Sequence, residues 1–352
     1  MKDTYKITIY LTKDSFEEII LFDEEYPNLN CIFSKYATFI LDMTEDELEQ
    51  SLEDLESDFA IFCNSNNIKT FAEKSVLQNM LDNKEELTKN CRSLYIVDVD
   101  EQTAKEIQDE HGIIVFSKEN INDNIFNQSH WRHQFIKNAR TSNDIISEWS
   151  DVLKDLVWLP TNSLVLTDNY LFNESAVTFD DCVENVKGLL NAILPEKLNV
   201  DFHILIVTRH PVCNKEKINK AIGTIKSYIQ SQRTYAIKIE YIFYETIHQR
   251  KIITNYNIMV GDRGFVNFNS RKCKVVENNP TYFCSIFQNV KESIGNTEYE
   301  IATNDLKAIY KLSKEVKDIC NTGIGDYSKR IIGDCNKDKS LNNRLLLSVA
   351  AI

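Results

Sequence analysis

The first 120 residues alternate between short apolar runs and amphipathic segments. Helices are expected near residues 69–83 and 101–110, and capping boxes at Ser15 and Thr44 begin two more. Strands that alternate with helices predict a small, mainly parallel α/β domain over residues 1–120. Runs rich in β-branched or aromatic side chains predict its strands at Lys6–Leu11, within Cys31–Asp42, and at Asp58–Cys63, Ser93–Val99 and Ile113–Ser117.

Residues 121–157 are predicted to form a linker and a helix. The segment is polar and asparagine-rich as far as residue 142, and an apolar helical face follows it. The linker contains Ser129-His130-Trp131-Arg132-His133. These aromatic and cationic side chains could stack on a nucleotide, or they could anchor a half-buried linker. The sequence favours the anchor, because nothing nearby in the chain supplies a phosphate cradle.

The remaining residues predict a second α/β domain over residues 158–279 and a helical C-terminal region over residues 280–352. Apolar stripes from Tyr282 to Val290 and from Leu306 to Ile319 predict the C-terminal helices. The expected fold is therefore two α/β domains, the second a sheet covered by helices, plus a helical C-terminal extension. In the second domain, strands are predicted at Leu164–Thr167, Phe202–Thr208, Ile239–Tyr244, Ile252–Val260 and Lys272–Val276, with helices at Thr178–Leu194 and Asn214–Gln230.

Composition narrows the class of protein. With 352 residues, 43% of them hydrophobic, the chain is long enough to bury two cores. A net charge of -13 gives no general attraction to DNA or to acidic membranes, so any phosphate contact must come from a local patch. The nine cysteines have no C-x-x-C spacing, which favours buried thiols of a cytoplasmic protein over disulfides or zinc. No apolar run reaches transmembrane length, and no cofactor is expected.

Acidic residues follow or surround several strands of the first domain. Nine acids and no basic residue lie between Asp42 and Asp58, which indicates a solvated helix face or a surface for a basic partner. Asp42, Asp98 and Asp100 follow strands, where carboxylates often hold magnesium, but Asp100 is also well placed to cap the next helix. The sequence favours capping, and no metal site is predicted.

The strongest chemical signal lies between two apolar runs, Ile239–Tyr244 and Ile252–Val260. The polar link between them carries His248 and Arg250 two residues apart, so in an extended chain both side chains share one face. A guanidinium holds two anionic oxygens, and an imidazole can attack phosphorus or move a proton. This pair therefore predicts a phosphate site.

The string from His248 to Asn255 resembles a degenerate H-x-K-x-x-x-x-D motif of the phospholipase D superfamily, with Arg250 and Asn255 in the lysine and aspartate places. The similarity is closest to the phospholipase-D-like C-terminal domain of MIT-domain proteins. Four pieces occur in that domain's order: Asp168-Asn169-Tyr170-Leu171, His203-Ile204-Leu205-Ile206-Val207-Thr208, Ile247-His248-Gln249-Arg250-Lys251-Ile252 and Asp262-Arg263-Gly264-Phe265. The resemblance covers residues 158–276, about a third of the chain.

The resemblance implies a catalytic His248 in an active member, with Arg250, Arg263, Asn255, Asp168 and Tyr170 around the phosphate. An active enzyme of this superfamily needs two such motifs, and this chain has one. Asparagine at 255 also removes the charge that would stabilise an imidazolium.

Three functions remain open. We expect a phosphate- or phosphodiester-binding protein that contacts a phosphorylated ligand or a nucleic acid, in a bacterial nucleic-acid-related or antiphage defence system. The first alternative is a phosphodiesterase or nuclease that works as a homodimer through His248. The second is an interaction protein in which His248 and Arg250 are structural. A homodimer or a protein partner would use the helical C-terminal region.

Overall fold

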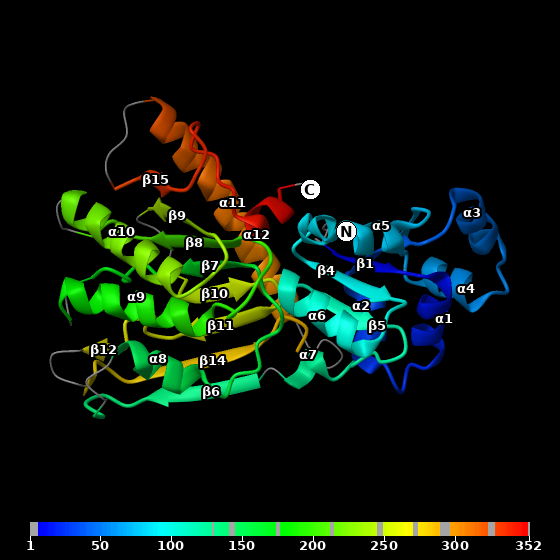
Figure 1. Cartoon of the computed structure of the whole chain (residues 1–352), viewed down its shortest axis with the longest axis horizontal. Helices are drawn as coiled ribbons and strands as arrows, with labels where there is room; N and C mark the ends of the chain where they lie inside the picture. The colour runs from blue at the N-terminus through cyan, green and yellow to red at the C-terminus, as the bar shows by residue number, and fades with distance from the viewer. Residues whose placement is uncertain are drawn as a thin grey trace.

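The computed structural model describes residues 6–128, 130–140, 145–173, 177–211, 215–244, 249–269, 274–288, 296–322 and 328–350. Two large sheets lie side by side, the first built by residues up to 117 and the second by the rest of the chain (Figure 1). Helices pack on the faces of both sheets. The predicted α/β fold class is confirmed.

The first sheet is fully parallel, with the order β3-β2-β1-β4-β5. Apolar side chains leave it on both faces, since successive residues of a strand point in opposite directions. α1, α2 and α4 cover one face, and α5, the short 3₁₀ helix η1 and α6 cover the other. The elements are β1 (Ile7–Leu11), α1 (Lys13–Leu21), α2 (Pro27–Tyr36), β2 (Ala37–Leu41), α3 (Glu45–Glu53), α4 (Asp58–Ser65), β3 (Lys69–Ala72), α5 (Val76–Asp82), η1 (Lys84–Thr88), β4 (Ser93–Val97), α6 (Glu101–His111) and β5 (Ile114–Ser117).

Several local predictions in this domain are wrong. The segment 58–63 is the helix α4 and not a strand, because the Ser57 hydroxyl caps it and Phe59 and Cys63 lie one turn apart on its buried side. The helix expected over residues 69–83 begins with the edge strand β3. α1 is capped by Thr12 and not by Ser15.

The second sheet is mixed, with the order β15-β9-β8-β7-β10-β11-β14-β6. β7, β8 and β9 are parallel, and the other pairs are antiparallel. Its strands are β6 (His130–Phe135), β7 (Ser163–Thr167), β8 (Phe202–Thr208), β9 (Ile237–Phe243), β10 (Lys251–Thr254), β11 (Asn257–Gly261), β14 (Asn279–Ser285) and β15 (Arg330–Gly333), and β12 (Phe268–Asn269) with β13 (Lys274–Val275) forms a separate ribbon.

Helices cover the two faces of this sheet unequally. One face packs against α8 (Ile145–Leu153), α9 (Phe179–Ile193) and α10 (Lys215–Ser231). The opposite face packs against α11 (Glu298–Thr322) and α12 (Arg344–Ser348). Figure 1 shows α9 and α10 in front of the strands, and α11 running from the second sheet towards the first.

The second domain takes strands from regions that were predicted otherwise. β6 lies in the expected linker, next to the four-residue helix α7 (Ile125–Gln128), and forms the outer edge of the sheet beside β14. β14 and β15 lie in the region 280–352, so that region is only partly helical. The expected strand Ile252–Val260 is a hairpin, β10 and β11, whose tip is Asn255-Tyr256.

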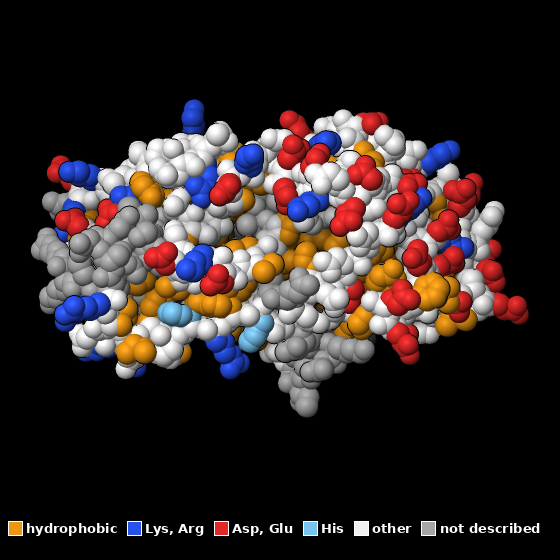
Figure 2. Space-filling view, turned by 60° about the horizontal axis from the view of Figure 1, so that its bottom comes forward, with side chains coloured by type: hydrophobic (Ala, Val, Ile, Leu, Met, Phe, Trp, Pro, Cys, Tyr) orange, Lys and Arg blue, Asp and Glu red, His pale blue; other side chains and the backbone are white. Residues whose placement is uncertain are grey.

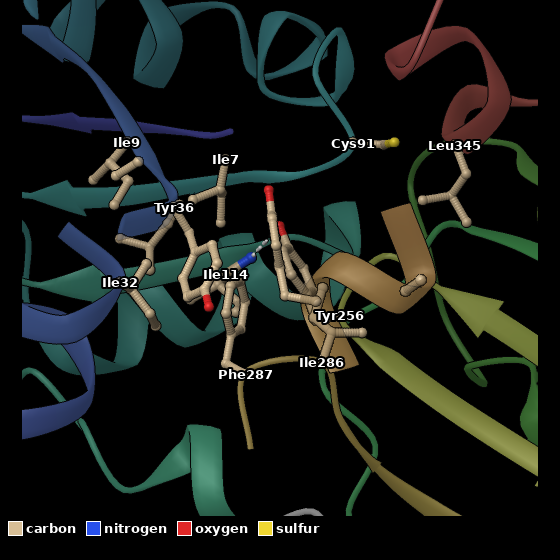
Figure 3. Close-up of a cluster of buried hydrophobic side chains, with 14 of the residues drawn as sticks. Ile7, Ile9, Ile32, Tyr36, Cys91, Ile114, Tyr256, Ile286, Phe287 and Leu345 are labelled. Carbon is tan, nitrogen blue, oxygen red and sulfur yellow. Dashed lines mark hydrogen bonds between the residues drawn. The ribbon is translucent and has the colours of Figure 1, made fainter. Parts of the chain in front are cut away.

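The hairpin tip joins the two domains. Tyr256 is fully buried in a hydrophobic cluster that contains residues of both sheets and of α11 and α12. Its hydroxyl donates to the backbone carbonyl of Ser93 in β4 and accepts the N–H of Ile114 in β5, at 3.4 Å. Figure 3 shows Tyr256 reaching into this cluster beside Ile286 and Phe287. A continuous core therefore connects the two sheets.

Candidate functional site

The carboxyl ends of β7, β8 and β9 meet at one edge of the second sheet because the three strands are parallel. β10 is antiparallel to β7, so its first residue, Lys251, lies opposite Thr167, the last residue of β7. We call this border the carboxyl edge. The charged and aromatic side chains that the strand ends place there are Asp168, Tyr170, Arg209, His210, Arg250 and Arg330.

Arg250 stands beside an aromatic ring at this edge. Its guanidinium carbon lies 5.2 Å from the centroid of the Tyr170 ring, which suits a cation–π contact. Its Nη1 donates to the backbone carbonyl of Asp262. Within the described residues its Nε atom is buried and has no hydrogen-bond partner, although the side chain as a whole is half-exposed. Arg250 is thus held in place and retains unused donor capacity.

Asp168 holds the backbone on which Tyr170 is placed. Its side chain is buried and accepts the backbone N–H groups of Tyr170 and Phe265, each at 2.9 Å. The second contact needs glycine at 264, where φ is +95° and a Cβ would lie 2.4 Å from the Asp168 carboxylate. Burial raises the pKa of Asp168 to about 6, although the two N–H donors and the nearby Arg250 partly oppose the rise.

A cavity of about 300 Å³ opens beside Tyr170. Arg209, which is exposed, and His210 line it together with Asn169. His210 Nε2 lies 3.3 Å from Nη2 of Arg330, which projects from the first position of β15. The exposed Arg209 therefore borders the same cavity as the Tyr170 ring, and Arg330 lies behind it in contact with His210.

The predicted site residues do not all gather here. Asp168, Tyr170 and Arg250 come together as expected. Arg263 is exposed and pairs with Asp262 at 3.4 Å, in the turn after β11. Asn255 lies at the other end of β10, roughly 17 Å from Arg250 by strand geometry. His248 lies outside the described residues.

Asn255 is enclosed by protein groups and not by a ligand cavity. Its side-chain oxygen accepts the hydroxyl of Thr161 and the backbone N–H groups of Asn162 and Ser163, at 2.9 to 3.2 Å. Its amide nitrogen donates to the carbonyl of Cys91 in the first domain. The side chain is fully buried and its hydrogen bonds hold the two domains together.

The acidic residues of the first domain have structural partners. Asp100 caps α6 through the N–H of Thr103, at 2.9 Å, which confirms the capping interpretation. Asp42 accepts the N–H of Ser75 at 2.6 Å, and Asp98 pairs with Lys118 at 2.6 Å. No group of three metal-ligating side chains occurs in the part of the chain that the structure describes.

Charge is divided unevenly between the domains. Residues 1–120 contain 27 acidic and 11 basic side chains, so the rest of the chain, with 26 acidic and 29 basic ones, is slightly positive. Figure 2 shows acidic side chains crowding the half of the molecule that the first domain forms, while basic side chains spread over the other half. The second domain is therefore the less repulsive of the two for an anion.

Two contributors to the edge carried no clear signal in the sequence. Arg330 lies about 120 residues from His210 along the chain, and only the pairing of β15 with β9 brings it to the site. Lys251 is bound by Asp305 of α11, at 2.6 Å. Both contacts depend on tertiary packing over long sequence separations, which local spacing does not encode.

No known family profile matches the chain, and no curated protein matches it. Among solved structures, the archaeal chromatin protein TrmBL2, described as having a novel mode of DNA binding, aligns with 67% of this chain at 9% sequence identity. The alignment covers 65% of TrmBL2 and has a TM-score of 0.22, which carries no information on function. No helix among the described residues is both long and apolar enough to cross a membrane.

Proposed function

We propose that the protein binds a phosphate group or a phosphodiester at the carboxyl edge of its second sheet, in the manner of a degenerate phospholipase-D-like domain. The observation that carries the proposal is the fixed guanidinium of Arg250 above Tyr170, beside a cavity lined by Arg209 and His210. Nucleic acids and lipid head groups both supply such a diester.

The chemistry of the edge supports anion binding more than bond cleavage. Guanidinium groups hold phosphate oxygens in a fixed fork, and the site lies on the less acidic domain. Asn255 is occupied between the domains, so it is not available to orient a catalytic imidazole at the edge. Binding without turnover is therefore the function that we infer.

The test measures binding of bis-p-nitrophenyl phosphate to the whole chain by calorimetry. We expect Arg250→Ala to weaken binding roughly 10- to 100-fold, since a hydrogen bond to a charged group contributes about 1.5–3 kcal/mol. Arg209→Ala should act in the same direction. The matched control is Arg140→Ala, because Arg140 is also exposed but lies away from the carboxyl edge.

The same ligand tests the enzymatic alternative, because hydrolysis releases coloured p-nitrophenolate. Turnover that disappears in His248→Ala would replace the binding function by a phosphodiesterase. Binding that Arg250→Ala and Arg209→Ala leave unchanged, with the chains folded, would refute the proposed site.

A further inference from the structure

A second cavity, of about 740 Å³, is lined by residues other than those around Tyr170. Its floor is formed by β11, β14 and β6, where Val260, Tyr282 and Arg132 are cross-strand neighbours in one row. Cys284, on the same face as Tyr282, belongs to the core beneath α11, so the cavity opens on the α11 side of the sheet. The floor is centred on an aromatic ring.

One wall of the cavity provides hydrogen-bond acceptors. Gln288 follows β14, and Glu298 is the first residue of α11. Among the described residues, Oε1 of Gln288 and Oε2 of Glu298 are buried and have no hydrogen-bond partner. Two buried acceptors that lack donors are costly, and they mark a place where a ligand can supply N–H groups.

The opposite rim provides positive charge. His130 and Arg132 lie on β6, the outermost strand of the sheet, and both are exposed. Glu298 is half-buried and begins α11, which the ion pair of Lys251 with Asp305 ties to β10, a more central strand than β6. The cavity therefore has acceptors on its inner wall, an aromatic floor and cations on its outer rim.

We propose that this cavity is a nucleotide-binding site. The base stacks on Tyr282 and donates N–H groups to Gln288 and Glu298. The phosphate binds Arg132 and His130 at the outer rim. A base with an exocyclic amino group fits best, because a carboxylate accepts such a group directly. In the cluster at residues 130–133, whose nucleotide role the sequence left open, His130 and Arg132 share the cavity face of β6, and Trp131 packs against the core on the other face.

This site is independent of the proposed phosphate function, and calorimetry on the whole chain separates the two. CMP, GMP, AMP and UMP are titrated in turn, and we expect UMP to bind most weakly. Tyr282→Ala should lower affinity by tenfold or more, as loss of base stacking does, while Tyr282→Phe should retain it. Glu298→Gln should reduce the preference over UMP. Thermal unfolding confirms that each variant is folded.

A comparison of CMP with cytidine then separates the contacts to the phosphate from the contacts to the base. Arg132→Ala should weaken CMP about tenfold and leave cytidine unchanged, because cytidine has no phosphate. Arg209→Ala should leave cytidine binding unchanged, whatever it does at the carboxyl edge, because Arg209 lines only the cavity beside Tyr170. The proposal is overturned if no nucleotide binds at millimolar concentration. It is also overturned if Tyr282→Ala and Arg132→Ala bind nucleotides as the natural chain does.

Discussion

Asn255→Ala is expected to weaken the whole protein and not the phosphate site. The side-chain oxygen of Asn255 accepts three donors, from Thr161, Asn162 and Ser163, and its nitrogen donates to Cys91 across the domain boundary. Alanine leaves the two backbone N–H groups and the Cys91 carbonyl without this partner, while the Thr161 hydroxyl keeps a second acceptor, the carbonyl of Ser163, at 3.1 Å. Because the position is fully buried, water does not readily replace the lost amide.

The expected loss follows from the groups left unpaired. A buried donor or acceptor without a partner costs about 1–3 kcal/mol, so the N–H groups of Asn162 and Ser163 and the carbonyl of Cys91 together amount to roughly 3–9 kcal/mol before any relaxation. Local movement reduces that figure, and we expect the free energy of unfolding to fall by about 3–5 kcal/mol. That is a large part of the roughly 5–15 kcal/mol typical of a folded domain.

Urea unfolding followed by circular dichroism measures the change, with Arg250→Ala as the matched comparison from the other end of β10. Arg250 is half-exposed, so its removal should change stability by less than about 1 kcal/mol. Where Asn255→Ala is still folded, it should bind bis-p-nitrophenyl phosphate as the natural chain does. If Asn255→Ala has normal stability but cannot bind the diester, Asn255 is part of the phosphate site, and the structural role assigned to it here is refuted.

Two further predictions concern the carboxyl edge and the domain boundary. The pKa of Asp168, raised to about 6 by burial, predicts tighter binding of a diester as the pH falls from 7.5 to 5, because the neutral carboxyl group no longer offsets Arg250. Calorimetry should show this trend, and Asp168→Asn should weaken it, since only the part that comes from protonation of His210 in the same cavity would persist; an unchanged trend in that variant would contradict the assignment. Gly112→Ala should destabilise the chain by at least about 1 kcal/mol, since φ is +64° and a Cβ would lie 2.4 Å from the Thr161 carbonyl oxygen. A melting temperature equal to that of the natural chain would contradict this prediction, because it would mean that the backbone around Thr161 shifts to accept the Cβ.

The centre of the second sheet could be predicted from the sequence because its strands are buried on both sides. β8 has four consecutive apolar residues at its centre, from Ile204 to Val207, and the helices before and after it in the chain, α9 and α10, have clear apolar stripes. The outer strands of the second sheet could not be predicted from the sequence. β6 is rich in histidine and other polar residues because its outer side is exposed, and its partner β14 is about 150 residues away. In β14, the close spacing of Tyr282 and Phe283 also fitted a helix.

Some residues of the candidate site could be predicted from the sequence, and others could not. Tyr170 and Asp168 follow a strong strand, and Arg250 precedes another, so antiparallel pairing of those strands was enough to bring them together. Arg330 depended on the late pairing of β15 with β9, which no local pattern indicates. Spacing alone also suggested that Asn255 belongs with Arg250, and it could not reveal that β10 ends in a hairpin tip.

The hairpin of β10 and β11 places Arg250 and Asn255 in different surroundings. Arg250 stands before β10, at an edge where it can meet an anion, and Asn255 and Tyr256 lie at the tip, inside the boundary with the first domain. β10 is only four residues long and is hydrogen-bonded on both sides, to β7 and β11, so it has little freedom to bend. The tip residues Asn255 and Tyr256 therefore anchor β10 to the first domain, and the pairing with β7 and β11 sets where Arg250 stands at the opposite end of the strand.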